Sequence, residues 1–206
     1  VAIINVLKKY CNDVIPKSID EAILNFTSYK LIYKDFFSIA RQIKSDIKEQ
    51  ADYLKCSIGI APNAFLAKLA TDLQKPDGLV EITAENIDEH LKKLQLTDLP
   101  GIASANERRL KKVGIYTPIE MRNASISLLR KAFGGIVGYY WHCRLHFYEV
   151  DLYVNQTKSK GAGRTISGQQ SASAQTLDAL IISLCTRLEQ RMVKQSVFCK
   201  QAIFSI

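Results

Sequence analysis

Residues 56–78 read CSIGIAPNAFLAKLATDLQKPDG, and this stretch decides the fold. The apolar run 56–60 predicts a short strand, and after a proline-containing break residues 64–73 repeat apolar side chains at helical spacing. The sequence KPDG at 75–78 is a strong helix stop signal, and a further apolar run at 79–82 predicts another strand. This alternation is typical of a sheet with helices packed on it.

The flanking sequence extends the same mixed pattern. Two β-like runs, 14–19 and 22–26, enclose Asp20 and Glu21 and predict a hairpin. Apolar periodicity predicts helices on both sides of these runs, at 1–11, 34–52 and 84–94.

From residue 98 the pattern changes to short helices. They are predicted at 104–113, 117–122, 125–132 and 135–147, and the last part of the chain predicts a strand at 164–168, a helix at 176–194 and a strand at 198–206. The fold class is therefore α+β, with a partial sheet covered by helices, a small all-helical unit and the beginning of a βαβ domain. The predicted divisions are 1–95, 96–150, a linker at 151–163, and 164–206.

Charge is distributed unevenly along the chain of 206 residues. The 28 Lys and Arg against 20 Asp and Glu give a net charge of +8, whereas the apolar fraction of 47% and charged fraction of 23% are ordinary for globular proteins. Residues 1–97 hold 13 basic and 13 acidic side chains, residues 98–170 hold 11 and 5, and residues 171–206 hold 4 and 2. This asymmetry favours a polyanion partner for the second half, with a merely cationic surface as the alternative.

Cysteine usage and hydropathy indicate a cytoplasmic protein. No apolar run approaches the ~20 residues of a membrane span, and no signal segment opens the chain. The chain starts at Val1 without Met and stops at Ile206 in an apolar run, so we expect a fragment. The cysteines are odd in number and form no CxxC pair, which fits reduced thiols: Cys11, Cys56, Cys143, Cys185 and Cys199.

Asp20 and Glu21 are the candidate metal ligands. Adjacent acids are usually solvated turn residues, but this pair is held between two apolar runs, and hard divalent cations favour carboxylate oxygens. Two such ions stabilise the attacking and leaving oxygens of a phosphoryl displacement, and holding both takes a third acid from elsewhere. Lys68 and Lys75, seven residues apart, tend toward one face, and Lys75 is suited to a triphosphate, although both also fit a solvated surface.

A second candidate site is the turn LPGIA at 99–103 and the helix after it. A tight turn that enters a helix exposes backbone N–H groups to phosphate, and basic side chains on the helix add sequence-independent affinity. An ordinary helix-turn-helix corner is the alternative. The candidate DNA contacts here are Pro100, Gly101, Ile102, Ala103, Lys111 and Lys112.

Taken in order, these motifs resemble the Y-family translesion DNA polymerases of the UmuC/DinB (ImpB/MucB/SamB) type. The matching segments are SIDEA at 18–22, SIGIAPN at 57–63, FLAKLA at 65–70, KPDG at 75–78 and DLPGI at 98–102. The resemblance implies a partial palm (1–95), a helical thumb (96–150) and a partial little finger (164–206). It implies error-prone, Mg²⁺-dependent nucleotidyl transfer in DNA damage tolerance and the SOS response, with primer-template DNA and deoxynucleoside triphosphates as partners.

The resemblance also assigns residue roles. Asp20 and Glu21 match the family's magnesium-binding, catalytic acids, and Lys75 matches its triphosphate contact. Lys68, the turn at 100–103 and Arg164 with Thr165 are expected to contact DNA. A sliding clamp is expected to bind only through a region outside this chain.

Departures from the family pattern leave a second function open. The family's first carboxylate motif precedes the equivalent of Val1, so the chain as given is not expected to polymerise. Ala64 stands where a lysine is usual, Asn25 where an aspartate is common, and Ala103 replaces a glycine. These substitutions motivate the alternative of a non-catalytic DNA-binding or regulatory relative.

Overall fold

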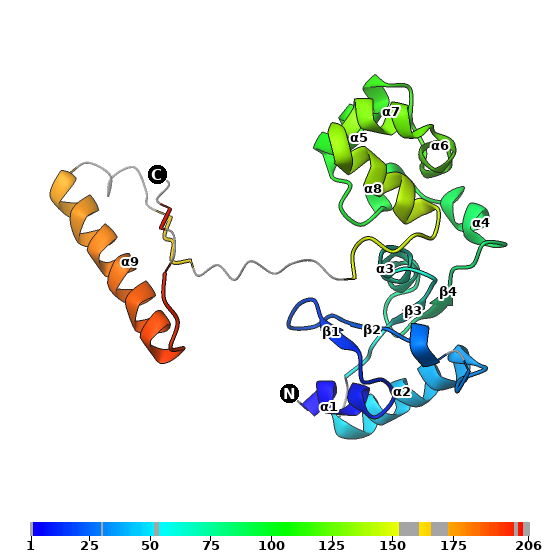
Figure 1. Ribbon diagram of the computed structural model, residues 1–206, viewed down its shortest axis with the longest axis horizontal. Coiled ribbons are helices and arrows are strands. Elements are labelled where there is room, and N and C mark those ends of the chain that lie inside the picture. Colours follow the sequence, from blue (N-terminus) through cyan, green and yellow to red (C-terminus); the bar gives the residue numbers. More distant parts are fainter. Residues whose placement is uncertain are drawn as a thin grey trace. The chain divides into compact units, whose positions relative to one another are not determined.

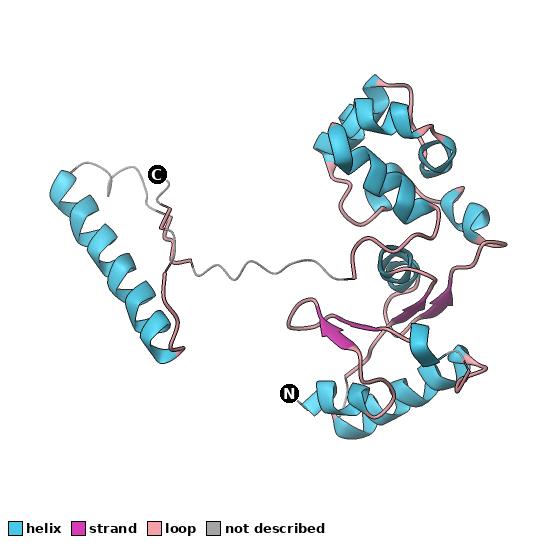
Figure 2. Ribbon diagram, in the orientation of Figure 1, coloured by secondary structure: helices cyan, strands magenta, loops and turns pink. Residues whose placement is uncertain are grey.

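A computed structural model describes residues 2–29, 31–51, 54–152, 161–165, 173–199 and 202–203. The chain forms two units, Val1–Val154 and Asn155–Ile206 (Figure 1). Helices predominate and the sheets are small, so the predicted α+β class is confirmed (Figure 2).

Helix α3 (Ala64–Leu73) is the central element of the first unit. It connects β3 (Ile58–Ile60) to β4 (Leu79–Glu81), and the two strands pair in parallel with Gly59 opposite Val80. Gly59 allows the close approach of β3 to α3, because a Cβ there would lie 2.0 Å from the Ala67 carbonyl oxygen. The predicted strand–helix–strand order is confirmed.

The predicted hairpin forms a separate two-stranded sheet. Strands β1 (Val14–Pro16) and β2 (Ala22–Leu24) pair antiparallel, with Ile15 opposite Ile23. The first strand ends earlier than the predicted run 14–19, because the amides of Lys17 and Ser18 both donate to the Glu21 carbonyl and close the turn. Helices α1 (Ala2–Lys8) and α2 (Phe36–Gln50) contribute the buried side chains of its core: Val6, Leu7, Ile43 and Ile47.

Short helices complete the first unit, one of them before α2 and the others beyond β4. They are η1 (Thr27–Tyr29) after the hairpin, then α4 (Ile87–Leu91), η2 (Leu96–Asp98), α5 (Ser104–Lys112), α6 (Pro118–Asn123), α7 (Ile126–Phe133) and α8 (Gly135–Leu145). One core joins α3 to these helices, through buried side chains that include Leu66, Leu110, Leu129 and Trp141. Helix α3 therefore lies between the strands and the helical region (Figure 1).

The second unit contains α9 (Ala174–Lys194), which begins at an N-cap where the Ser173 hydroxyl accepts from the Thr176 amide. Residues 161–165, 198–199 and 202–203 do not form strands, and the rest of the two predicted strands lies outside the described residues. Within the described ranges, no helix combines the length and the apolar character needed to cross a membrane. Among the described residues, Cys11, Cys56, Cys143 and Cys185 are free thiols.

Candidate active site

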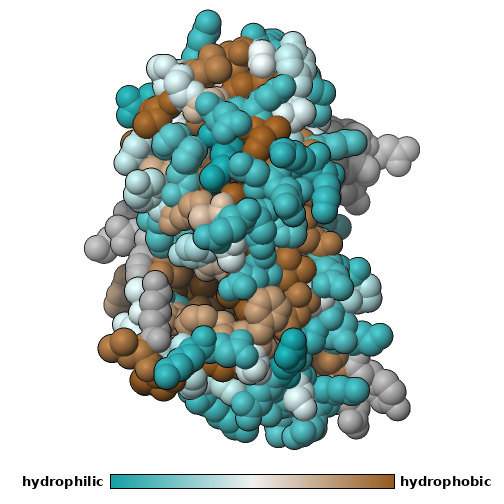
Figure 3. Space-filling model, turned by 90° about the vertical axis from the view of Figure 1, so that its right-hand side faces the viewer, coloured by the Kyte–Doolittle hydropathy of each residue, from teal (hydrophilic) through white to brown (hydrophobic). Residues whose placement is uncertain are grey.

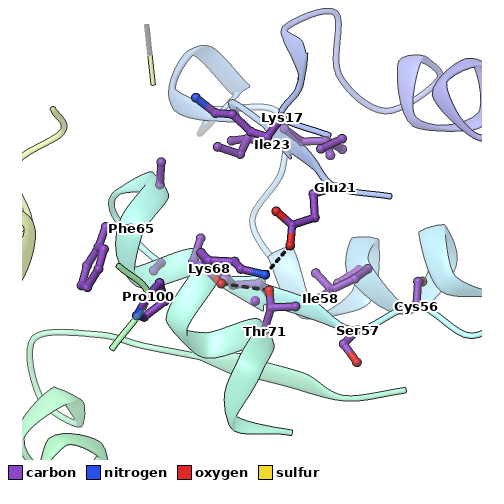
Figure 4. Close-up of a pocket in the computed structure, with 18 of the residues that line it drawn as sticks. Lys17, Glu21, Ile23, Cys56, Ser57, Ile58, Phe65, Lys68, Thr71 and Pro100 are labelled. Atoms are coloured by element: carbon purple, nitrogen blue, oxygen red, sulfur yellow. Dashed lines mark hydrogen bonds and ion pairs between the residues drawn. The ribbon is translucent and has the colours of Figure 1, made fainter. Parts of the chain in front are cut away.

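A cavity of about 1740 Å³ in the first unit collects much of the predicted site. The β1–β2 hairpin, β3, α3 and the loop before α5 all contribute to its lining (Figure 4). Six of the predicted residues line it: Asp20, Glu21, Lys68, Lys75, Pro100 and Gly101.

The hairpin turn presents the two acids differently. The Ser18 hydroxyl donates to Asp20 Oδ1 at 2.6 Å, and the Asp20 amide donates back to the same hydroxyl at 3.3 Å. The hydrogen bond from Ser18, with smaller contributions from the charges of Lys68 and Lys75, lowers the pKa of Asp20. The Asp20 carboxylate is thus exposed and kept ionised, as a cation ligand requires.

Glu21 points into the cavity toward α3. Its carboxylate contacts the ammonium of Lys68 (Figure 4). The same ammonium lies 3.5 Å from Asp72 Oδ1. The Lys75 ammonium lies 2.5 Å from the same Asp72 oxygen. Burial lowers the pKa of Lys68, but the hydrogen bond to Glu21 and the Asp72 charge outweigh it, so the pKa is raised. The four side chains form a chain of alternating charge.

The residues that could hold a divalent cation are Asp20 and Glu21. Both supply carboxylate oxygens, which suit Mg²⁺, and both line one cavity. In the part of the chain that the structure describes, no group of three or more His, Cys, Asp or Glu side chains could hold a metal ion. The donor set therefore fits magnesium in kind and lacks a third acid among these residues.

The loop before α5 has the tight geometry that its sequence predicts. Gly101 has a φ of 89°, which favours glycine, and its carbonyl accepts from the Asn106 side chain at 3.1 Å. Ile102 is 4% exposed and its amide donates to the Leu99 carbonyl, so its side chain and N–H are both used inside the protein. Ala103 is the exposed N-cap residue of α5.

The remaining predicted DNA contacts are not among the residues that line the cavity. Lys111 and Lys112 lie in the last turn of α5, where Lys111 bonds Glu107 at 2.7 Å. Arg164 and Thr165 are exposed and belong to the second unit. Figure 3 shows one face of the protein on which hydrophilic side chains predominate and hydrophobic ones interrupt them.

Sequence reasoning missed Asp72 and Lys17. Asp72 links the two candidate lysines, and its spacing of four and three residues from them was an available signal. Lys17 in the hairpin turn donates to the carbonyls of Asp151 and Leu152 at 2.8 and 3.2 Å. The two ends of that contact are more than 130 residues apart in the sequence, and no sequence pattern predicts it.

A group of hydrogen bonds around Asn63, here called the polar joint, fixes the start of α3. The sequence did not predict it. Asn63 is the buried polar residue of the described chain, and its side chain caps α3 at Leu66 and donates to the carbonyls of Arg144 and Tyr148. The Glu149 carboxylate accepts from the Ala64 amide at 2.7 Å. This joint holds the helical region against α3.

This chain is similar in sequence to known DNA polymerases. The impB/mucB/samB family matches residues 1–72. DNA polymerase IV of Citrobacter koseri is 32% identical over 190 residues, which cover 92% of this chain and 54% of that protein. DNA polymerase IV of Nitrosopumilus maritimus is 30% identical over 185 residues, which cover 88% and 50%. The chain thus spans about half the length of the curated relatives it matches.

Solved structures give the same result. An insertion ternary complex of Dbh DNA polymerase matches with a TM-score of 0.62 and 31% identity, over 72% of this chain and 43% of that one. DinB from Sulfolobus solfataricus matches with a TM-score of 0.58 and 30% identity, over 70% and 42%. The chain therefore matches the impB/mucB/samB family over residues 1–72, and over most of its length it is similar to Y-family DNA polymerases.

Proposed function

We propose that this chain is the palm, thumb and partial little finger of an error-prone translesion DNA polymerase. The reaction is template-directed nucleotidyl transfer, in which the primer 3′-hydroxyl attacks the α-phosphate of a deoxynucleoside triphosphate and pyrophosphate leaves. The observation that supports this most is the shared cavity, which is lined by Asp20, Glu21, Lys68 and Lys75 and in which Glu21 contacts Lys68. Such a set of opposite charges suits a metal-bound polyphosphate.

Each residue has a role in this proposal. Asp20 and Glu21 hold Mg²⁺, which when bound neutralises the charge that develops on the phosphates. Lys75 positions the triphosphate, and Lys68 releases Glu21 to the cation while staying next to Asp72. The loop at 100–103 holds the DNA backbone through N–H groups of its exposed residues Gly101 and Ala103, and the basic end of α5 adds positive charge.

The proposal extends to the longer protein. The 206 residues alone are proposed to be inactive, because the described residues hold no group of three acids that could bind metal and the relatives are about twice as long. A role in DNA damage tolerance and the SOS response, a cytoplasmic location and clamp binding through a region outside this chain belong to the same proposal.

Primer extension by the longer protein tests the site. Asp20→Ala and Glu21→Ala are expected to abolish extension and to leave affinity for primer-template DNA nearly unchanged, because DNA binding depends on other residues. Glu89→Gln is the matched control, since Glu89 is exposed and lies outside the cavity lining. Retained extension by either alanine variant would contradict the metal-ligand assignment.

The second candidate function is a non-catalytic DNA-binding or regulatory relative. The ion pair that engages Glu21 and the two-acid donor set favour it. The two proposals separate in one experiment: a longer protein that binds primer-template DNA with a steep salt dependence but never extends it supports the second. An accidental basic surface predicts no such binding.

A further inference from the structure

Lys44 on α2 forms hydrogen bonds and an ion pair with the turn that follows α3. Its ammonium donates to the carbonyl oxygens of Asp77 and Gly78 at 2.6 and 3.1 Å, and it lies 2.8 Å from Asp77 Oδ1. The Lys44 side chain is only 17% exposed, whereas that of Asp77 is 52% exposed. One ammonium thus satisfies two main-chain carbonyls and one carboxylate of a turn that lies 33 residues further along the chain.

The turn itself needs an external support. Asp77 has a φ of 60°, in the left-handed region that a residue with a Cβ adopts at a cost. The hydrogen bond from Lys44 lowers the pKa of Asp77, which keeps the carboxylate charged and paired. The Gly78 amide donates to the Ser57 hydroxyl at 3.0 Å, and a Cβ on Gly78 would lie 1.8 Å from the Gln74 carbonyl oxygen. The turn is closely fitted on both of these sides.

Lys75 begins this turn and faces the cavity. Lys75 and Asp77 are among the cavity-lining residues, and the Lys75 side chain is 53% exposed. Lys44 does not line the cavity. Lys44 therefore supports the turn from the side away from the cavity. A ligand in the cavity would contact Lys75 but not Lys44.

We propose that Lys44 is a positioning residue for nucleotide binding. By fixing the carbonyls of Asp77 and Gly78, it sets the point from which Lys75 reaches the triphosphate. This inference rests on the proposed function, because it assumes that Lys75 contacts that triphosphate.

Removing the ammonium has a specific expected effect. In Lys44→Met the side chain keeps its length, but two carbonyls lose their donor and the charged Asp77 loses its partner. The turn then samples other conformations, and Lys75 must be ordered when the nucleotide binds. A contact made equally in ground and transition state changes KM and leaves kcat in place.

Steady-state primer extension by the longer protein measures this split. Lys44→Met is expected to raise the KM for deoxynucleoside triphosphate about 5- to 20-fold with kcat within about twofold. Lys44→Arg, which keeps the donor, is expected to restore most of the loss. Lys48→Met is the matched control, since Lys48 lies one turn away on α2 and acts on Asp77 only through its charge.

A double-mutant cycle distinguishes the positioning role of Lys44 from the triphosphate contact of Lys75. If Lys44 acts through Lys75, adding Lys44→Met to Lys75→Ala raises KM no further. A KM for Lys44→Met equal to that of Lys48→Met, or an additive effect in the double variant, would overturn the positioning role. If Lys75→Ala itself leaves KM unchanged, the triphosphate assignment of Lys75 fails, and the inference fails with it. Thermal unfolding of each variant shows that the fold is retained.

Discussion

The carboxylate of Glu21 in the β1–β2 turn contacts the ammonium of Lys68 on α3. Forty-seven residues separate the two, so the contact joins the hairpin to the strand–helix–strand unit. The same ammonium lies 3.5 Å from Asp72, and this places one cation between two acids. Lys68 thus supplies the positive charge that Glu21 faces.

The Glu21–Lys68 pair is expected to contribute little to stability. The side chains are 46% and 35% exposed, and exposed ion pairs contribute about 0.2–1 kcal/mol. Urea unfolding of Glu21→Gln, Lys68→Met and the double variant measures the coupling, which should shrink as salt rises. The exposed Glu107–Lys111 pair is the reference. A coupling above about 2 kcal/mol would mean that the pair holds the hairpin in place.

Asn63→Ala is expected to be strongly destabilising. It removes the α3 cap and leaves the carbonyls of Arg144 and Tyr148 without this donor inside the protein. Loss of a cap costs about 1 kcal/mol and an unsatisfied buried group about 1–3 kcal/mol, so the free energy of unfolding should fall by about 2–4 kcal/mol. Asn12→Ala, at an exposed position, should change it by less than about 0.5 kcal/mol. Similar losses of stability for both variants would contradict the stabilising role of the Asn63 hydrogen bonds.

Asp35 gives a pH-dependent prediction. Its side chain caps α2, and hydrogen bonds from the Ser38 hydroxyl and the Ser38 and Phe37 amides lower its pKa. Because the folded pKa lies below the unfolded value of about 3.9, the stabilisation is present above that pH and is lost as pH falls through the folded pKa.

The measurement compares urea midpoints at several pH values. Asp35→Ala should lower the midpoint at pH 7, and the difference from the native chain should shrink as the pH falls below about 4. Asp35→Asn keeps a capping acceptor without the charge, so it should lose less stability at pH 7. A loss for Asp35→Ala that does not change with pH would show that the carboxylate charge plays no part.

Lys111 and Lys112 should differ in DNA binding. Lys111 already bonds Glu107, whereas the structure gives Lys112 no such ion pair within the described residues. Each phosphate contact contributes about 0.9 to the slope of log affinity against log salt. Lys112→Met should therefore reduce that slope by about 1 and Lys111→Met by less, as measured by fluorescence anisotropy with primer-template DNA. Equal reductions would show that DNA breaks the Glu107 pair.

The local sequence was sufficient to predict the β3–α3–β4 unit. The apolar spacing and the KPDG stop predicted a helix at 64–73, and α3 spans these residues. The strands are shorter than their apolar runs, because hydrogen bonds at the hairpin turn end the first one early. Local signals therefore located the elements, while tertiary contacts set where the strands end.

The site was predicted in part. The structure brings both acids and both lysines to one cavity, although their roles stay predictions. Ile102 is predicted to contact DNA as part of the turn at 100–103, and the structure buries its side chain, because the sequence of a tight turn does not specify which apolar residue faces inward. Lys44 was not found, since its partners are main-chain atoms far along the chain.

The contact of Lys17 with the carbonyls of Asp151 and Leu152 has a consequence for how this protein varies. Every residue type has a carbonyl oxygen, so substitutions at 151 and 152 leave these two acceptors in place. The attachment of the hairpin turn to this segment is thus encoded at position 17 alone. It will produce no covariation between the two ends of the contact, however many related sequences are aligned.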